Sequence, residues 1–314
     1  MEWKNQNSTP SFILIGLSNH PQLQILLFFI FFVIYVISLL GNILIVTIII
    51  IDTRLHLPMY FFLINLSALD IWCTSVAVPK MLTNIIMKRK DISFAGCVVQ
   101  LCFFTSALGT ELLLLTVMGF DRYIAICYPF HYTIIMNKKL CLLLAAAVWI
   151  IGLVNSLVHT GLIFRLHFCG DNILDHFFCE VPSVLRLSCT DTRLNDLVMT
   201  AADSFFGISC FLLTLVSYTY IISAVIKIRS AEGKRKAFST CASHLTVVGL
   251  YYATVIYTYL RPAFSYAMAD DKIVSALYTI LSPVLNPIVY SLRTKEVKEA
   301  FMKIVGKKIF PQRI

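Results

Sequence analysis

The sequence predicts an all-α membrane protein: a bundle of seven transmembrane helices with a short amphipathic helix after the seventh. Apolar residues make up 58% of the 314 positions and charged residues only 14%, which is outside the range of ordinary soluble domains. Seven apolar stretches each reach the ~20 residues that a helix needs to cross a hydrocarbon core. The net charge of +9 does not indicate a nucleic-acid-binding protein, because the basic residues are dispersed between apolar stretches and form no basic face.

An odd number of spans puts the two ends of the chain on opposite sides of the membrane. Placing the N-terminus outside puts more of the 26 Lys and Arg residues on the inner side than on the outer side, as the positive-inside rule requires. The predicted spans are Leu26–Ile51, Pro58–Met87, Gly96–Cys127, Leu140–Phe164, Leu197–Ile226, Ala237–Leu260 and Ile273–Leu292. The chain therefore divides into an outer tail over 1–22, a seven-span domain over 23–292 and an inner segment over 293–314.

The two flanking segments carry features that fit this topology. On the outer tail, Asn7-Ser8-Thr9 matches the acceptor motif for N-glycosylation, a modification of secreted and outward-facing chains. In the inner segment, apolar residues recur at helical spacing with Lys and Glu between them, which predicts an amphipathic helix on the inner leaflet. These apolar residues are Val297, Ala300, Phe301, Ile304 and Val305.

Four cysteines lie on the predicted outer side. Cys97 is at the outer end of the third span, and Cys169, Cys179 and Cys189 are in the loop before the fifth. Disulfides persist on this oxidising side, but four cysteines allow three pairings and the sequence alone does not choose among them. A disulfide from the loop to the third span would make the loop a lid over the outer mouth of the bundle.

Apart from Asp121 at the inner end of the third span, three acidic residues lie inside predicted spans, at Asp70, Glu111 and Asp203. A central acid costs about 2.5–3.5 kcal/mol of insertion free energy, so a function is expected for each. Asp70 and Glu111, with Asn286 of the seventh span, are a candidate cluster for a sodium ion or a shared proton; hydrogen-bonded helix packing is the alternative. Asp203 lies in the outer third of its span and could point into a pocket.

The same three acids allow a competing function, a transporter or a proton or ion channel that uses Asp70, Glu111 and Asp203 as a relay. Against it, no internal repeat relates the two halves of the chain, whereas many transporters show one. We also find no nucleophile–base or metal-ligand motif, so we expect neither an enzyme nor a metal site.

An adjacent pair of charges, Asp121-Arg122, follows a run from Gly96 to Phe120 whose only charged residue is Glu111. Charges at this depth are costly unless they face protein or water, so a functional pair is the favoured interpretation. Side chains that extend to the membrane surface are the alternative. The topology puts this pair at the inner end of the third span.

Several motifs, in order along almost the whole chain, resemble the signatures of the vertebrate odorant receptors within the rhodopsin-like (class A) G-protein-coupled receptors. They lie at Leu55–Leu63, Ser67–Asp70, Met118–Pro129, Lys236–Leu245 and Asn286–Arg293. The resemblance implies a receptor that binds small, largely apolar volatile molecules in the outer half of the bundle and activates a stimulatory olfactory-type G protein to raise cyclic AMP. It also implies a plasma-membrane location in olfactory cilia, with membrane lipid as a partner and no nucleic acid.

The resemblance assigns roles to individual residues. Asp121 resembles the lock that holds Arg122, which meets the G protein, and Asp70, Glu111 and Asn286 resemble the family's ion-binding cluster. Two disulfides are implied, Cys97–Cys179 and Cys169–Cys189. The full set of implied switch residues is Asp121, Arg122, Tyr123, Tyr218, Asn286 and Tyr290.

A candidate ligand wall follows from spacing and from the resemblance together. Helical spacing puts Phe104, Thr105 and Leu108 on one side of the third span, and the resemblance adds Ala202, Phe206, Val255, Tyr259 and Thr279. Such a wall suits a small molecule held by its shape and one or two hydrogen bonds, although each side chain could instead pack between helices. Phe104 stands where amine receptors carry an aspartate, which disfavours a charged amine.

One motif departs from the family pattern. Odorant receptors usually read Met-Ala-Tyr before Asp-Arg-Tyr, whereas this chain reads Met118-Gly119-Phe120. A glycine weakens a helix by ~1 kcal/mol relative to alanine. Elevated activity without ligand is therefore a hypothesis for this chain.

Overall fold

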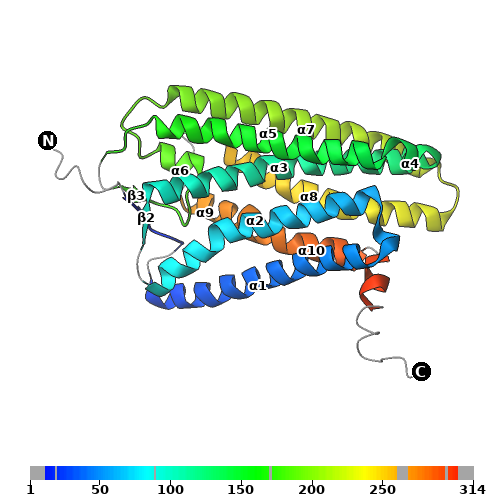
Figure 1. Cartoon of the computed structure of the whole chain (residues 1–314), viewed down its shortest axis with the longest axis horizontal. Coiled ribbons are helices and arrows are strands. Elements are labelled where there is room, and N and C mark those ends of the chain that lie inside the picture. Colours follow the sequence, from blue (N-terminus) through cyan, green and yellow to red (C-terminus); the bar gives the residue numbers. More distant parts are fainter. Residues whose placement is uncertain are drawn as a thin grey trace, which may run out of the picture.

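The structure is a computed structural model that describes residues 11–17, 20–87, 90–169, 172–259, 268–293 and 296–302. These residues form a bundle of seven long helical paths that run along the long axis of the molecule (Figure 1). The paths are α1 (Pro21–Ile51), α2 (Pro58–Met87), α3 (Phe94–Cys127), α5 (Lys138–Phe164), α7 (Arg193–Lys227), α8 (Ala231–Tyr259), and a last one made of α9 (Met268–Ala276), a π-helical segment (Leu277–Leu281) and α10 (Ser282–Arg293). The predicted fold class is confirmed.

Six stretches of these paths are long and apolar enough to cross a membrane. They are α1, α2, α3, α5, α7 and the segment Lys272–Val289. The seventh helix, α8, is 29 residues long, but Lys234, Arg235 and several hydroxyl-bearing residues make it less apolar. Length and packing against its neighbours, rather than apolarity alone, place α8 in the bundle.

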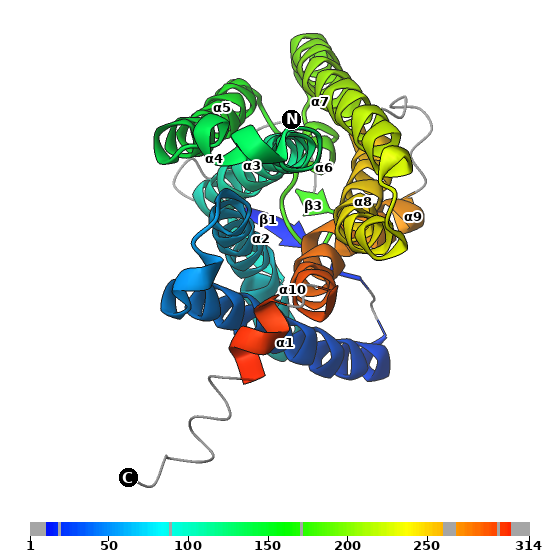
Figure 2. The ribbon, with the colours of Figure 1, turned by 90° about the vertical axis from the view of Figure 1, so that its right-hand side faces the viewer.

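The centre of the bundle is α3. It packs against α2, α5, α7 and α8, and Figure 2, viewed along the bundle, shows its neighbours around it. Of the six apolar spans, α3 has the largest buried share and α1 the smallest. A helix whose apolar side chains remain exposed on most sides suits contact with lipid, so α1 lies at the edge of the bundle.

Except for α2, which starts at Pro58 as predicted, the observed helices begin earlier than the predicted spans. The third starts at Phe94 rather than Gly96 and the fourth at Lys138 rather than Leu140. In each case a polar side chain caps the first turn: the Ser93 hydroxyl accepts from the Gly96 amide, and Asn137 accepts from the Leu140 amide. Hydropathy alone does not detect such caps, because they are polar.

A small sheet covers one end of the bundle. Strand β1 (Ser11–Leu14) pairs antiparallel with β2 (Asp91–Ser93) and parallel with β3 (Ile173–Leu174). Phe12 and Leu14 of β1 are buried beneath it. The short helix α6 (Val181–Leu185) and both disulfides lie at this same end, which we call the disulfide end. None of these strands was predicted, because segments of two to four residues carry no reliable periodicity.

The opposite end, which we call the Arg122 end, holds the short connections Thr53–Leu55, Pro129–His131 and α4 (Tyr132–Ile135). A helical segment over 296–302 follows α10 (Figure 1). Its residues Val297 and Ala300 are buried while Phe301 is half exposed, as expected for an amphipathic helix. Ile304 and Val305 lie outside the described residues.

A proline inside the last path leaves one backbone carbonyl without its helical partner. Pro287 lies inside α10, and a proline has no N–H to donate to the carbonyl four residues earlier. Asn42 and Ser38 of α1 donate to the carbonyl so freed, that of Pro283, at 3.0 and 3.3 Å.

Candidate functional site

A cavity of about 140 Å³ lies between α3, α5 and α7, in the half of the bundle nearer the disulfide end. It reaches α8 through Tyr251 and Tyr252, and α6 through Val181. Most of its wall is apolar. The polar and ionisable side chains in the lining are Thr105, Asn155, His159, Asp203, Tyr251 and Tyr252.

Three of the predicted ligand residues line this cavity, namely Thr105, Leu108 and Phe206. Phe104 does not: it is fully buried, and its ring centre lies 4.6 Å from that of Phe178 and 6.0 Å from that of Tyr278. Phe104 therefore packs against the loop and the π-helical segment of the last path rather than facing α7. A ligand role for the three lining residues stays a prediction.

The other predicted ligand residues have different outcomes. Thr279 is buried in the π-helical segment, with no hydrogen-bond partner for its Oγ1 among the described atoms. Ala202 is half buried on α7, and neither residue is in the cavity lining. The side chains of Val255 and Tyr259 lie outside the described part of the chain.

An ionisable pair spans the cavity wall between α5 and α7. The Nε2 atom of His159 lies 3.9 Å from Oδ1 of Asp203. Asp203 was expected to point into a pocket, and it does line one. His159 was not predicted as a site residue. The signal available for it was spacing, because Asn155 and His159 are four residues apart and so share one face of a helix.

Two glycines shape the cavity in opposite ways. A Cβ on Gly152 of α5 would lie 2.1 Å from Oγ1 of Thr110 and 2.9 Å from its backbone nitrogen, so only glycine permits this contact of α5 with α3. A Cβ on Gly207 of α7 would meet no atom within 4 Å. Gly207 therefore leaves room inside the cavity that a larger side chain would fill.

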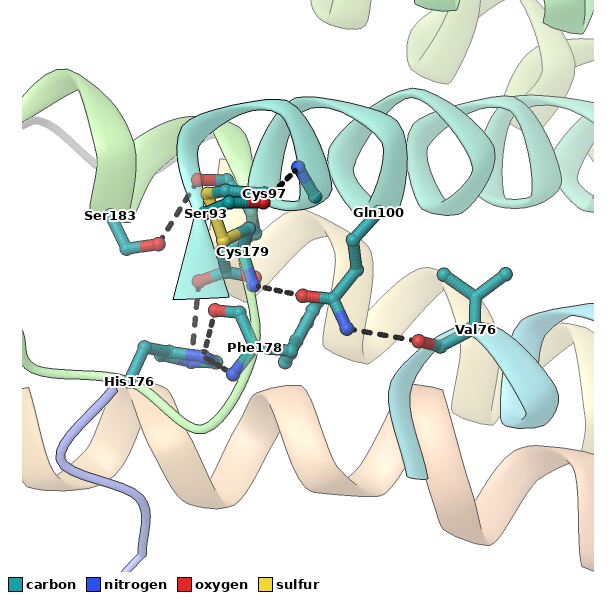
Figure 3. Close-up of a disulfide and its surroundings, with 10 residues drawn as sticks. Val76, Ser93, Cys97, Gln100, His176, Phe178, Cys179 and Ser183 are labelled. Atoms are coloured by element: carbon teal, nitrogen blue, oxygen red, sulfur yellow. Dashed lines mark hydrogen bonds and ion pairs between the residues drawn. A yellow bond between two sulfur atoms is a disulfide. The ribbon is translucent and has the colours of Figure 1, made fainter. Parts of the chain in front are cut away.

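The loop between α5 and α7 covers the disulfide end of the bundle. Disulfides join Cys97 to Cys179 and Cys169 to Cys189, the pairing that the family resemblance implied. Gln100 of α3 reinforces the first of them: its Oε1 accepts from the Cys179 amide at 3.0 Å, and its Nε2 donates to the Val76 carbonyl at 2.9 Å (Figure 3). The loop is thus linked to α3 and, through Gln100, to α2.

Polar contacts, one buried and one partly buried, also link this loop to the last helical path. The Tyr278 hydroxyl donates to the Glu180 carboxylate at 2.8 Å, and the Lys272 ammonium lies 2.5 Å from the carboxylate of Asp175. His176 Nε2 lies 3.4 Å from the other Glu180 oxygen. Burial lowers the pKa of the His176 imidazole from its ordinary value of 6.5, although Glu180 and the Phe178 carbonyl act in the opposite direction.

A second polar group lies deeper, where α2, α3 and α10 meet. Asn286 Nδ2 donates to both carboxylate oxygens of Asp70, at 3.0 and 3.1 Å. Glu111 is buried and close enough for its charge to act on Asp70. Oε1 of Glu111 and Oδ1 of Asn286 have no hydrogen-bond partner among the described residues. The structure therefore brings the three predicted residues together.

Comparison with known proteins gives one consistent result. A profile of the olfactory receptor family matches residues 31–308. The human protein olfactory receptor 13A1 is 50% identical over 300 residues, covering 96% of this chain and 92% of that protein. Olfactory receptor 5AR1 of the mouse is 46% identical over 308 residues, covering 98% of this chain and 99% of the relative.

The chain belongs to the olfactory receptor family. Members of this family are G-protein-coupled receptors and not enzymes. Family membership favours a receptor over the transporter or channel that the three buried acids allowed. It also implies, in general terms, an odorant ligand and a G protein as partners.

At the Arg122 end of this olfactory receptor, Asp121 and Arg122 are both buried. The Asp121 carboxylate accepts a hydrogen bond from the hydroxyl of Tyr132 in α4, at 2.9 Å. Nε of Arg122 is buried without an acceptor in the described part of the chain. Tyr132 was not predicted, because its position beside α3 depends on the turn after Cys127.

Near Arg122, consecutive hydrogen bonds link α7, α8 and α3. The Tyr218 hydroxyl of α7 lies 2.7 Å from Nδ1 of His244 in α8, and Nε2 of the same ring lies 3.2 Å from the Leu115 carbonyl of α3. Because that carbonyl can only accept, Nε2 carries the proton and Nδ1 accepts from Tyr218. Tyr123 is partly buried, and its ring centre lies 5.7 Å from that of Tyr220, with the two rings tilted relative to each other. The side chain of Tyr290 lies outside the described residues.

Proposed function

We propose that this olfactory receptor binds a small, largely apolar volatile molecule in the cavity between α3, α5 and α7, and that binding activates a stimulatory olfactory-type G protein and raises cyclic AMP. The cavity carries this proposal. An engineered apolar cavity of about 150 Å³ holds benzene, and a hollow of about 140 Å³ suits a ligand of similar size. Molecules of that size and polarity are volatile.

We place the disulfide end outside the cell and the Arg122 end in the cytoplasm. The two disulfides support this orientation, because disulfides persist in oxidising compartments. In this orientation the tail over 1–22, with Asn7 as a glycosylation site, is extracellular, and the segment over 293–314 is cytoplasmic. The site of action is the plasma membrane of olfactory cilia.

Signalling in this proposal is a shift between two arrangements of the helices. Two helices connect the cavity directly to the cytoplasmic end, because α3 and α7 each line the cavity and continue to the Arg122 end. A ligand that binds one arrangement more tightly shifts the population toward it. The arrangement that it favours breaks the Tyr218–His244 contact and exposes Arg122, which is buried here, so that Arg122 meets the G protein.

The buried group of Asp70, Glu111 and Asn286 is a candidate site for a sodium ion or a shared proton. Its free acceptors are oxygen atoms, Oε1 of Glu111 and Oδ1 of Asn286. Oxygen ligands suit a hard cation, and two carboxyl groups this close favour sharing one proton. Either would hold α2, α3 and α10 together.

The test is a cyclic AMP reporter in cells that express the receptor, with a broad panel of small odorants. We expect at least one active compound, and we expect Gly207→Phe to lower its potency by more than about tenfold, because the new ring fills the cavity. Gly161→Phe is the matched control: a Cβ there also meets no atom within 4 Å, and Gly161 is not in the lining. Surface staining checks that both variants reach the membrane.

Two results would contradict the proposal. Equal potency in Gly207→Phe and Gly161→Phe would remove the cavity as the ligand site. A fall in cyclic AMP, or a response that persists in cells lacking the stimulatory olfactory-type G protein, would remove the coupling.

A further inference from the structure

The cavity contains one ionisable pair, and the two partners approach it from different helices. His159 comes from α5 and is 4% exposed, whereas Asp203 comes from α7 and is 23% exposed. Their nearest atoms, Nε2 and Oδ1, are 3.9 Å apart. This separation exceeds the 2.7–3.2 Å of a normal hydrogen bond, so His159 and Asp203 do not form a hydrogen bond with each other.

The surroundings decide the total charge of the pair. An isolated charge in an apolar interior is costly, whereas two opposite charges or two neutral groups are tolerated. The pair is therefore either an imidazolium beside a carboxylate or a neutral imidazole beside a carboxylic acid. Both forms have zero net charge, and both present one hydrogen-bond donor and one acceptor to the cavity.

We propose that His159 and Asp203 select a neutral ligand with a hydroxyl group, a small alcohol or phenol. This inference rests on the proposed function, since it concerns the ligand of the same cavity. A hydroxyl group both donates and accepts, so it satisfies both partners at once. One oxygen atom can lie about 2.8 Å from each of them, because the 3.9 Å separation is less than twice that distance.

Other functional groups match the pair less well. The oxygen of a ketone, aldehyde or ester only accepts, and so leaves one buried partner without a hydrogen bond, which is costly. A carboxylate or an ammonium group would add a net charge to a neutral pair in an apolar cavity. Thr105 and Asn155 also line the cavity, but neither forms such a two-helix pair.

The experiment measures binding rather than signalling. Full-length receptor in lipid nanodiscs is titrated with hexanol, 2-hexanone, hexanoic acid and hexylamine, and the rise in unfolding temperature gives an apparent Kd for each. We expect hexanol to bind at least about tenfold more tightly than 2-hexanone, the ratio for one well-made hydrogen bond in place of an unpaired group.

Variants then locate the preference. Asp203→Leu is expected to bring the ratio of the two Kd values below about threefold, and His159→Leu to do the same. Asp203→Asn keeps a donor and an acceptor without a charge, so it should retain the preference. A preference retained in Asp203→Asn would show that substitution at this position does not by itself prevent folding. Ser204→Leu, one position along α7 and outside the lining, is the matched control.

The proposal is overturned if 2-hexanone binds as tightly as hexanol, if hexanol does not bind, or if the preference survives in Asp203→Leu. In any of these cases the proposed function can still stand, because it is decided by the cyclic AMP response to the wider panel and its loss in Gly207→Phe. A tenfold preference that Asp203→Leu and His159→Leu abolish would support it.

Discussion

The two ends of the bundle are built from the same helices but held together in different ways. At the disulfide end, α3, α5 and α7 surround a hollow, and two disulfides hold the loop above it. At the Arg122 end the helices are joined by single hydrogen bonds, such as Tyr218 with His244 and Tyr132 with Asp121. Helix α3 takes part in both ends.

The two kinds of restraint, disulfides at one end and single hydrogen bonds at the other, fit the packing at each end. A hollow lacks contacts across its centre, so its walls need restraints that do not depend on filling it. Covalent links and the close contact at Gly152 provide them. Single hydrogen bonds contribute only about 0.5–1.5 kcal/mol each, so the contacts at the Arg122 end can be exchanged for others at small cost. We expect that end to be the one that changes.

The largest expected effect tests the covalent restraint. Replacing Cys97 and Cys179 by serine removes a disulfide with a sequence separation of 82, whereas Cys169 and Cys189 are only 20 apart. Chain entropy predicts a loss of about 4–5 kcal/mol for the first and about 3 kcal/mol for the second. The measurement is thermal unfolding of each double variant in one detergent. Equal unfolding temperatures would show that loop length does not decide the restraint.

The next effect tests the contact between α1 and the last path. Asn42→Ala removes the donor at 3.0 Å from the Pro283 carbonyl, leaving a buried acceptor less well paired, and should cost about 1–2 kcal/mol of unfolding free energy. Thr47→Ala is the control, since its hydroxyl bonds only within α1, to the Ile43 carbonyl. If both variants lose the same stability, the hydrogen bond between the two helices contributes no more to the free energy of unfolding than one within α1.

A smaller effect sharpens the description of the Arg122 end. A Cβ on Gly119 would lie 3.7 Å from Cε1 of His244 and 4.0 Å from Cγ2 of Thr214, so alanine fits there in ordinary contact. Gly119→Ala should stabilise the receptor by about 1 kcal/mol and lower cyclic AMP measured without odorant.

The control is Gly249→Ala in α8, where a Cβ would meet no atom within 4 Å. Gly249→Ala has the same gain in helix propensity as Gly119→Ala but adds no contact between α3 and α8. A baseline that falls equally in both variants, or in neither, would reject the idea that Gly119 loosens the switch.

The smallest expected effect concerns acid pH at the disulfide end. Because burial lowers the pKa of His176 below 6.5, the folded protein binds this proton less readily than the unfolded chain. Stability is therefore full above the unfolded pKa and falls as the pH drops below about 6.5. Glu180 and the Phe178 carbonyl act against the effect of burial on this pKa, whereas Lys272 acts in the same direction as burial.

Unfolding temperatures at about pH 7.5 and about pH 5.5 measure this effect. His176→Gln should reduce the difference between them, with Asp175, Glu180 and Lys272 kept as they are. An unchanged difference in His176→Gln would show that His176 does not set the pH dependence.

Much of the candidate site was accessible to sequence reasoning because it depends on spacing within one helix. Thr105 and Leu108, which helical spacing puts on one side of α3, both line the cavity, and their role in ligand binding stays a prediction. Phe104, next to them, turns instead toward Phe178 of the loop. His159 was missed because its partner, Asp203, lies on another helix, and no pattern within α5 indicates which helix it faces.

By itself the sequence determined the helical membrane fold, the order of the spans and the family, because hydropathy and motifs are properties of neighbouring residues along the chain. The start of α2 at Pro58 was predicted to the residue. Only the tertiary structure decided the three-stranded sheet, the partner of the Pro283 carbonyl and the pairing of His159 with Asp203. These contacts join segments far apart in the chain, and their geometry is set by how the helices pack.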